Sequence, residues 1–458
     1  MVSLDRAVHR KSERSEPKTD EGGEAVGNRR GGEARSMASA TGDSGRAQLL
    51  AQALGRGNVE RAWKRVKANG GSAGVDGRTV EATADYLREH WPRLKRELLD
   101  GTYRPAPVRR VAIPKPGGGE RELGIPTALD RLIQQALLQV LQPLIDPQFS
   151  DHSYGFRPGR RAHDAILRAQ GYVEAGFQIV VDVDLEKFFD RVNHDVLMGR
   201  LAKRIADKAV LRLIRRYLDA GVMAQGVVIA RHEGTPQGGP LSPLLANVLL
   251  DDVDQELERR GHRFVRYADD CNVYVRSQRA GERVLDGLRR LYGRLKLRIN
   301  ESKSAVASVF ERTFLGYAFG RTADSLRVKR KVARKALERL KDRLRQLTCR
   351  TRGRSIGQIV EELRAYLLGW KQYFQLARMP FVFRELDEWL RHRLRMLHLV
   401  HWKRGRTTYR ELRALGANAV VAATIAAHTR SWWRNSAMLL NGVLTLTYFD
   451  RLGLPRLA

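Results

Sequence analysis

The alternation of apolar and polar positions predicts a β-hairpin over residues 264–275, with acidic residues at its turn. Apolar side chains recur at every second position on both sides of the turn, which is the period of a strand. The segment Tyr267-Ala268-Asp269-Asp270 places two neighbouring carboxylates between the strands. Two such carboxylates repel each other, and a divalent cation would neutralise them. Asp is also common in ordinary turns, so the hairpin alone leaves both interpretations open.

A second acidic strand is predicted upstream. The β-branched run of residues 179–183 is typical of a buried strand, and Asp182 and Asp184 lie on one face of it. Periodicity does not choose between these two aspartates. Enzymes of phosphoryl transfer commonly hold two metal ions about 4 Å apart with carboxylates from separate strands. One or two carboxylates here, with Asp269 and Asp270, would supply that set.

Other stretches have the helical period. Apolar residues recur at three- and four-residue spacing over 129–144, which predicts a core helix. Two further helices are predicted beyond residue 327, where Lys and Arg occupy the face opposite the apolar stripe. The stripe of the first helix is Val332, Ala336, Leu340, Leu344 and Leu347.

Composition limits the classes of function. The 458 residues include two cysteines, too few for a disulfide framework or a four-cysteine zinc site, and this favours a reducing cytoplasm. No apolar run approaches the length of a membrane span, so we expect no membrane association. The net charge is +32, and more than half of the excess falls after residue 320. A surface this basic indicates a nucleic-acid partner.

Several blocks of the sequence, in their order along the chain, resemble the bacterial group II intron-encoded proteins, which are reverse transcriptases and RNA maturases. The resemblance covers residues 48 to about 455. Besides the segment of residues 267–270, the blocks are Gly74-Val75-Asp76-Gly77, Ile113 to Gly119, Ser153-Tyr154-Gly155-Phe156-Arg157-Pro158, Asp184 to Asp190, Thr235-Pro236-Gln237-Gly238-Gly239 and Phe314-Leu315-Gly316-Tyr317.

The resemblance implies an α+β right-hand polymerase fold with fingers and palm over residues 46–320. An α-helical thumb and maturase domain is expected over 321–402, and a basic DNA-binding-like tail over 403–458. Residues 1–45, rich in Gly, Ser, Arg and Glu, are expected to be a disordered tail. Many family members carry a C-terminal zinc nuclease, for which this sequence has too few cysteines.

The resemblance also assigns roles to individual residues. Two Mg²⁺ ions would be held by Asp184, Asp269, Asp270 and the backbone carbonyl of Leu185, with Asp182 as a supporting acid. The incoming nucleotide would meet Lys115, Arg121, Phe189, Gln237 and Lys303, with Phe189 crowding a ribose 2′-hydroxyl. The primer grip would be Phe314, Leu315, Gly316 and Tyr317. The basic residues proposed to bind RNA are Arg391, Arg393, Arg395, Lys403 and Arg404.

The implied function is RNA-directed DNA polymerisation, combined with binding of group II intron RNA, assistance to splicing, and copying of the intron into DNA. The implied partners are the intron RNA, an RNA template with a DNA primer, target DNA and deoxynucleoside triphosphates. Two alternatives remain open at this stage. One is an RNA-binding maturase that acts only in splicing, and the other is a reverse transcriptase that serves defence or repair.

Overall fold

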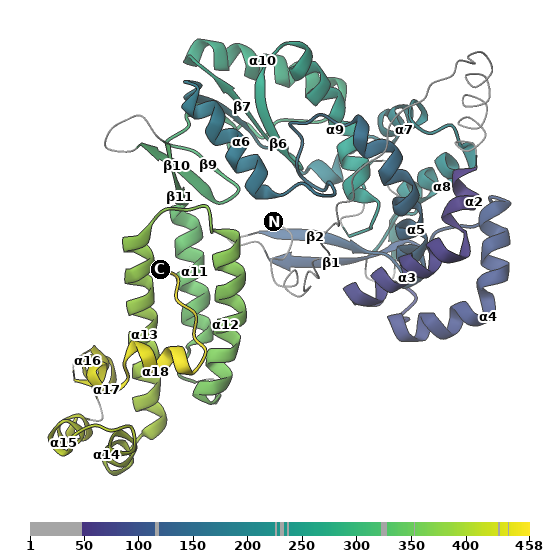
Figure 1. The fold of residues 1–458 in the computed structure, drawn as a ribbon. Coiled ribbons are helices and arrows are strands. Elements are labelled where there is room, and N and C mark those ends of the chain that lie inside the picture. The colour runs from purple at the N-terminus through teal and green to yellow at the C-terminus, as the bar shows by residue number, and fades with distance from the viewer. Residues whose placement is uncertain are drawn as a thin grey trace, which may run out of the picture. The chain divides into compact units, whose positions relative to one another are not determined.

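The computed structural model describes residues 48–114, 119–224, 227–229, 233–235, 238–321, 328–351, 353–428, 431–437 and 439–458. The expected N-terminal tail therefore lies outside the described residues. The described chain forms two compact units that divide between Val309 and Phe310 (Figure 1). The mixture of helices with largely antiparallel sheets, in which only the β1–β4 pair of the described strands is parallel, confirms the α+β class. Within the described residues, no helix has the length and apolar character needed to span a bilayer.

The first unit is rich in helices, several of which begin at a side chain that caps the first turn. Thr127, Asn193, Asp207 and Ser277 each accept a hydrogen bond from a backbone N–H of the helix that follows. The helices are α2 (Leu49–Ala53), α3 (Arg56–Asn69), α4 (Val80–Leu99), α5 (Ala128–Ile145), α6 (Ala162–Glu174), α7 (His194–Ala202), α8 (Lys208–Asp219), α9 (Ser242–Arg259) and α10 (Gln278–Arg294), with short 3-10 turns η2 (Asp146–Gln148) and η3 (Phe188–Asp190).

Two four-stranded sheets complete this unit. The first has the order β2-β1-β4-β5, and its β1–β2 hairpin lies within the range expected for the fingers and palm. The second has the order β6-β7-β3-β8, and we call it the palm sheet. The strands are β1 (Val108–Pro114), β2 (Glu120–Ile125), β3 (Ile179–Val183), β4 (Val222–Ala224), β5 (Val227–Ile229), β6 (Arg263–Tyr267), β7 (Asp270–Val275) and β8 (Ala305–Ser308).

In the palm sheet, β3 lies between β7 and β8 and is antiparallel to both. Its register pairs Val183 with Cys271, so the residue after β3 lies beside the start of β7. Tyr267 pairs with Asp270, which closes the β6–β7 hairpin around Ala268 and Asp269. The hairpin predicted from alternation is therefore present, and both acidic segments reach the same edge of the sheet.

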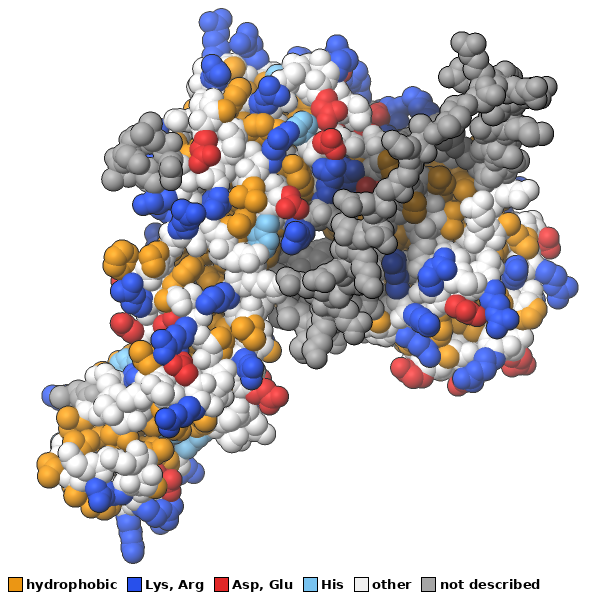
Figure 2. All heavy atoms as spheres, in the orientation of Figure 1, with side chains coloured by type: hydrophobic (Ala, Val, Ile, Leu, Met, Phe, Trp, Pro, Cys, Tyr) orange, Lys and Arg blue, Asp and Glu red, His pale blue; other side chains and the backbone are white. Residues whose placement is uncertain are grey.

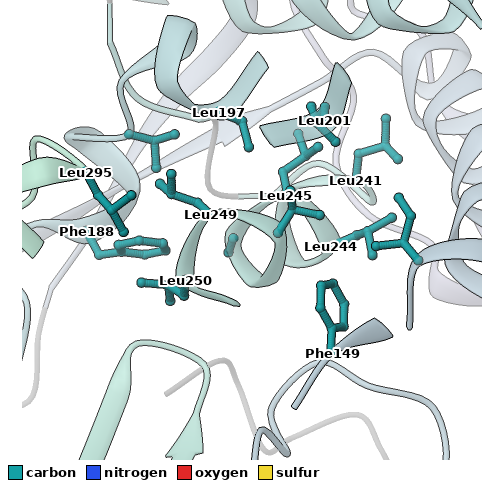
Figure 3. Close-up of a cluster of buried hydrophobic side chains, with 14 of the residues drawn as sticks. Phe149, Phe188, Leu197, Leu201, Leu241, Leu244, Leu245, Leu249, Leu250 and Leu295 are labelled. Atoms are coloured by element: carbon teal, nitrogen blue, oxygen red, sulfur yellow. The ribbon is translucent and has the colours of Figure 1, made fainter. Parts of the chain in front are cut away.

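The core of the first unit surrounds α9. Leu244, Leu245, Leu249 and Leu250 of this helix are buried in one cluster with Phe188, which lies in the acidic segment after β3; Leu250 lies beside the Phe188 ring, and Leu244 lies toward Phe149 (Figure 3). Most of the helix surface is buried, because α9 contacts α7, α5, α10 and β6. The sheet edge that carries the aspartates is thus supported by a rigid, close-packed helix.

The second unit combines a three-stranded antiparallel sheet, ordered β11-β10-β9, with a group of helices (Figure 1). The apolar stripe predicted for its first helix is confirmed for Ala336, Leu340, Leu344 and Leu347, which are buried on α11, whereas Val332 is buried at the end of strand β11. The elements are β9 (Thr313–Phe314), β10 (Tyr317–Arg321), β11 (Val328–Val332), α11 (Arg334–Leu347), α12 (Ile356–Tyr373), α13 (Pro380–Trp402), α14 (Gly405–Ala414), α15 (Ala419–Ala427), α16 (Trp432–Ala437), α17 (Leu440–Val443) and α18 (Leu446–Arg451).

The last residues of the chain belong to the same core as α11 to α13. Phe449, Leu454 and Leu457 are buried in one cluster with side chains of α12 and α13. The backbone N–H of Leu457 donates to the Asp387 carboxylate at 3.0 Å, which fixes the end of the chain on α13. Residues 403–458 therefore pack with the thumb and maturase helices within one unit.

Candidate active site

The β6–β7 turn carries two of the three predicted catalytic aspartates. Ala268 has a backbone φ of 59°, in the left-handed region that residues with a side chain rarely adopt. Such a conformation costs on the order of 1–3 kcal/mol and is often found at functional sites. It makes the hairpin turn tight, so that Asp269 lies in the turn itself and Asp270 begins the next strand of the palm sheet.

Asp184 reaches the same edge from β3. Its backbone N–H donates to Ser304 Oγ at 3.0 Å, and its carbonyl accepts from the Asn300 N–H at 2.8 Å. These bonds fix the end of β3 against the segment before β8. Asp182, two residues earlier, lies opposite Asn272 in the sheet, and the Asn272 amide, turned with its nitrogen toward Asp182, donates to Asp182 Oδ1 at 3.0 Å.

Electrostatics confirm that these carboxylates lie close together. Desolvation by the surrounding protein, together with the charges of Asp269, Asp184 and Asp182, raises the pKa of Asp270 to about 7. Solvent nevertheless reaches the Asp270 side chain, so it lines an open site rather than the core. Such a concentration of negative charge favours cation binding.

Lys303 supplies one positive charge at this site. Its Nζ lies 3.2 Å from Asp184 Oδ2, and the lysine side chain is otherwise well exposed. The predicted nucleotide-binding lysine is thus placed beside a predicted metal ligand. An exposed pair of this kind contributes at most about 1 kcal/mol to stability, so breaking it in favour of another anion costs little.

Leu185 was predicted to offer its backbone carbonyl to a metal. Leu185 forms an antiparallel bridge with Ile299. The hydrogen bonds of this bridge are made by the flanking residues; for example, the Glu186 N–H donates to the Arg298 carbonyl. No backbone hydrogen bond from the described residues reaches the Leu185 carbonyl. Because successive carbonyls of a strand point in opposite directions, this one points toward the β7 side of β3.

The residues present fit a divalent metal ion in their chemistry. Oxygen donors suit Mg²⁺, which is usually bound through one or two carboxylates and completes its shell with water and substrate phosphates. Within the described parts of the chain, no group of three or more Asp, Glu, His or Cys side chains lies close enough together to hold a metal ion by itself. An open site of carboxylates completed by a triphosphate agrees with both observations.

A buried network behind the turn was not predicted. The Arg266 guanidinium is fully buried and donates to the Ala268 carbonyl at 2.9 Å, to Ser153 Oγ at 2.8 Å and to both oxygens of Asp254. Asp254 is also fully buried, and Asn247 accepts from the same guanidinium at 2.9 Å. Arg266 therefore holds the strained residue of the acidic turn directly.

The block of residues 153–158 packs against the same turn. The Tyr154 N–H donates to the Arg266 carbonyl at 2.8 Å, and a side chain at Gly155 would overlap the Ala268 backbone. Arg157 of this block is buried and bonded to Asp146 at 3.0 Å. The motif is therefore a structural support for the acidic turn.

The nucleotide side of the site is described in part. Phe188 is buried in the core, whereas Phe189 is half-buried and packs at the edge of that core. The Phe189 carbonyl accepts from the Thr235 N–H at 2.7 Å, so the loop of residues 235–239 begins beside it. At its other end, Gly238 has a φ of 140° and lies against the Gly124 carbonyl of β2, too close for a side chain.

Three of the predicted nucleotide contacts cannot be placed on this frame. Lys115 and Gln237 lie outside the described residues, as does the side chain of Arg121. The Arg121 backbone belongs to β2 and pairs with Ile113 of β1. The described residues on either side of Gln237 are placed: Thr235 lies beside Phe189, and Gly238 lies beside Gly124 of β2.

The predicted primer grip is the β9–β10 turn of the second unit. Leu315 and Gly316 both have positive φ, 50° and 78°, as a two-residue hairpin turn requires. Phe314 and Tyr317 are buried, and the Tyr373 hydroxyl donates to the Leu315 carbonyl at 2.9 Å. The turn is thus anchored on α12, and its backbone is the part left to contact a ligand.

The predicted RNA contacts in α13 need correction. Arg391 is fully buried and bonded to Asp387 at 3.1 Å. Arg395 is also buried, and its Nε donates to the Leu444 carbonyl at 2.8 Å. Both face protein, because α13 is surrounded on most sides by other elements of its unit. Arg393 is half-buried and donates to Thr348 Oγ1 at 2.7 Å.

Lys403 and Arg404 are exposed at the end of α13, as an RNA contact requires. Lys403 ends the helix with a φ of 57°, which turns the chain toward α14. Lys and Arg side chains also spread over the face shown in Figure 2. Of the five residues predicted to bind RNA, these two remain the best placed.

Carboxylates that meet from separate strands at one sheet edge define a metal-dependent phosphoryl-transfer site. Comparison with known proteins specifies the class further. Residues 113–319 match the reverse transcriptase (RNA-dependent DNA polymerase) family, and residues 337–416 match the group II intron maturase-specific domain. The chain belongs to the reverse transcriptases that carry a group II intron maturase domain. Their activity depends on divalent metal ions and acts on nucleic acid.

The chain is also similar to individual known proteins. The chain is 34% identical to Protein YkfC of Escherichia coli (strain K12), over 53% of this chain and 74% of that protein. It is 34% identical to the group II intron-encoded protein LtrA of Lactococcus lactis subsp. cremoris, over 48% of this chain but 37% of that protein. A solved Cas6-RT-Cas1–Cas2 complex aligns with 26% identity and a TM-score of 0.36, over 54% of this chain and 42% of that one.

Proposed function

We propose that this reverse transcriptase copies the group II intron RNA that it also binds and helps to splice. The observation that carries the proposal is the convergence of Asp184, Asp269 and Asp270 at one edge of the palm sheet, in a chain with a maturase domain. The partners would be intron RNA, an RNA template with a DNA primer, target DNA and deoxynucleoside triphosphates. The proposed compartment is the cytoplasm.

The reaction is attack of a primer 3′-hydroxyl on the α-phosphorus of the nucleotide, with pyrophosphate leaving. Asp184, Asp269, Asp270 and the Leu185 carbonyl would hold two Mg²⁺ ions. When bound, these ions lower the pKa of the attacking hydroxyl and stabilise the charge on pyrophosphate. The chain's own part is to fix the carboxylates, through the strained turn at Ala268 and the hydrogen bonds at the end of β3.

The remaining residues would handle the nucleotide. Lys115 and Arg121 are proposed to bind the triphosphate and Gln237 to lie beside the nucleotide. Lys303 is well placed to move from Asp184 to the leaving pyrophosphate once cations occupy the carboxylates, since its ion pair with Asp184 is exposed. Residues 314–317 are proposed to hold the primer end through the backbone of their turn.

A primer-extension assay tests the polymerase half of the proposal. The purified protein should extend a DNA primer annealed to intron RNA when Mg²⁺ and deoxynucleoside triphosphates are supplied, and should accelerate splicing of the same RNA. Splicing without extension would favour the alternative of a maturase that no longer polymerises. Extension without any effect on splicing would favour a role in defence or repair.

We expect Phe189→Ala to weaken selection of the sugar. If the half-buried ring crowds a ribose 2′-hydroxyl, its removal should raise the relative kcat/KM for ribonucleotides roughly 10- to 100-fold, the scale of steric discrimination in a pocket. Phe188→Ala is the matched control. Because Phe188 is fully in the core, this change should cost about 3–5 kcal/mol of stability without altering the ratio. An unchanged ratio for the Phe189 variant would assign its ring to packing alone.

Basic residues in and just after α13 should differ in their effects on mutation: a buried one should affect stability, and exposed ones should affect RNA binding. Arg391→Ala leaves Asp387 without its buried partner, and we expect it to lower the free energy of unfolding by about 3–5 kcal/mol. The exposed pair Lys403→Ala with Arg404→Ala should instead keep the melting temperature and flatten the salt dependence of RNA binding. Urea unfolding and a log–log plot of affinity against salt measure the two effects. The reverse outcome would place the RNA contact at Arg391.

A further inference from the structure

A basic cavity lies at the opposite end of the β6–β7 hairpin from the catalytic aspartates. It is a cavity of about 370 Å³ bounded by the α9–β6 and β7–α10 connections and one face of α10. β7 begins at Asp270 and ends at Val275, which borders the cavity. Five residues of strand separate the two sites by about 17 Å. The cavity is therefore distinct from the polymerase site.

The rim of the cavity is formed by four arginines, Arg260, Arg263, Arg276 and Arg283. All four are exposed. Arg260 is bonded to Glu256 at 2.6 Å, and Arg276 lies 4.9 Å from the centre of the Phe177 ring. Within the described residues, neither Arg263 nor Arg283 has an ion-pair partner. The rim thus carries more positive charge than its surroundings neutralise.

The floor of the cavity is apolar. Leu257, Val284, Leu288 and Leu291 are buried beneath the arginines. Gly287 lies among them in the middle of α10, where glycine costs about 1 kcal/mol relative to alanine. A Cβ at this position would lie 3.3 Å from Arg260 Nη1, so the missing side chain lets the guanidinium lie over the helix.

We propose that this cavity binds a single-stranded segment of RNA, with phosphates on the arginine rim and one nucleotide in the hollow. Guanidinium groups pair with phosphate oxygens through two parallel hydrogen bonds, which is the chemistry that unpaired arginines offer. The Phe177–Arg276 pair provides flat faces on which a base can stack. A volume of about 370 Å³ lies at the lower end of the range for small-ligand pockets.

The proposal extends the RNA binding of the proposed function to a region away from the primer and template. Because the cavity and the aspartates lie at opposite ends of one hairpin, the cavity is suited to hold a part of a long RNA that is not being copied. Inorganic phosphate and a free nucleotide share the chemistry of the rim, so the experiment includes both as probes.

The test compares two pairs of substitutions in the full-length protein. Arg263→Ala with Arg283→Ala removes the unpaired rim charges, and Arg279→Ala with Arg290→Ala removes the same charge from exposed positions of α10 that do not line the cavity. For single strands each phosphate contact contributes about 0.7 to the salt slope. The rim pair should lower the slope for a long single-stranded RNA by about 1.4 and weaken binding roughly tenfold near 0.1 M salt.

The control pair should leave both quantities nearly unchanged. Equal losses in the two pairs would overturn the site, because the effect would then be one of overall charge, and so would no loss in either. The third outcome concerns the small probes. If 5′-AMP or inorganic phosphate binds the wild-type protein and long RNA does not displace it, the cavity is a site for a free nucleotide or phosphate instead. Primer extension on a short duplex should be the same in every variant. If the wild-type protein does not extend the primer at all, the proposed polymerase function is wrong, and the test of the cavity is unaffected.

Discussion

Replacing Asp269 and Asp270 together by Asn is expected to abolish cDNA synthesis on a primed RNA template. Neutral amides do not compensate the charge of divalent cations, and a loss of at least 10³-fold, about 4 kcal/mol of transition-state stabilisation, is the expected scale. Asn keeps the shape of the side chains and tolerates a turn, so the hairpin should persist. Single-turnover extension at saturating Mg²⁺ and nucleotide measures the loss.

For the same variant we expect no loss of stability, in contrast to the loss of activity. The neighbouring carboxylates help to raise the pKa of Asp270 to about 7, so they repel one another when no cation is present. Removing two of the charges should leave the melting temperature in EDTA unchanged or raise it. Intron RNA affinity should also be retained. Asp85→Asn with Asp286→Asn, at exposed positions on α4 and α10, is the matched control and should extend primers normally. Extension by the active-site variant would refute the assignment of the metal ligands.

The second large effect is expected at Arg266 and Asp254. Arg266→Met leaves Asp254 charged and buried without a partner, which should cost about 3–5 kcal/mol of folding stability. Combining it with Asp254→Leu replaces the ion pair by apolar groups of similar size, and much of that stability should return. The combined variant still lacks the hydrogen bond to the Ala268 carbonyl. A bond from a charged donor is worth about 1.5–3 kcal/mol, so kcat should remain roughly 10- to 100-fold low.

The measurements that separate positioning from folding are the Mg²⁺ requirement and the kinetic constants. A loosened turn should raise the Mg²⁺ concentration for half-maximal activity and lower kcat, with little change in the KM for nucleotide. Arg266→Lys keeps the charge beside Asp254 but has no fork to reach every acceptor, so it should be stable and partly active. If the double variant recovered full activity together with stability, Arg266 would serve only the fold.

Much of the active site could be predicted because the spacing of apolar residues indicates which side chains lie on one face of a strand or helix. The hairpin around Asp269 followed from alternation, and the stripe that includes Leu340 and Leu344 followed from helical spacing; both are present. Prediction failed where charge was taken as a sign of exposure. Arg391 and Arg395 lie in a helix whose partners come from far along the chain, and no local pattern reports those partners.

Arg266 was missed for a related reason, although a signal existed. We interpreted Val265 and Tyr267 as the informative positions of the strand and left the residue between them unassigned. The complementary signal lies in α9, where Asn247, Asp251 and Asp254 are buried at helical spacing in an otherwise apolar segment. A polar stripe on a buried helix requires partners, and a strand arginine is one of the few that suffice.

The order of strands in the palm sheet also affects how the protein is made. β3 is synthesised long before either of its neighbours, because β7 begins at Asp270 and β8 ends at Ser308. Until the ribosome has released residue 308, the apolar run Ile179–Val183 lacks at least one of the strands that pair with it. Unpaired apolar strand edges are sites of aggregation. Slower translation at low temperature, or a chaperone that shields nascent chains, should therefore raise the soluble yield of this enzyme.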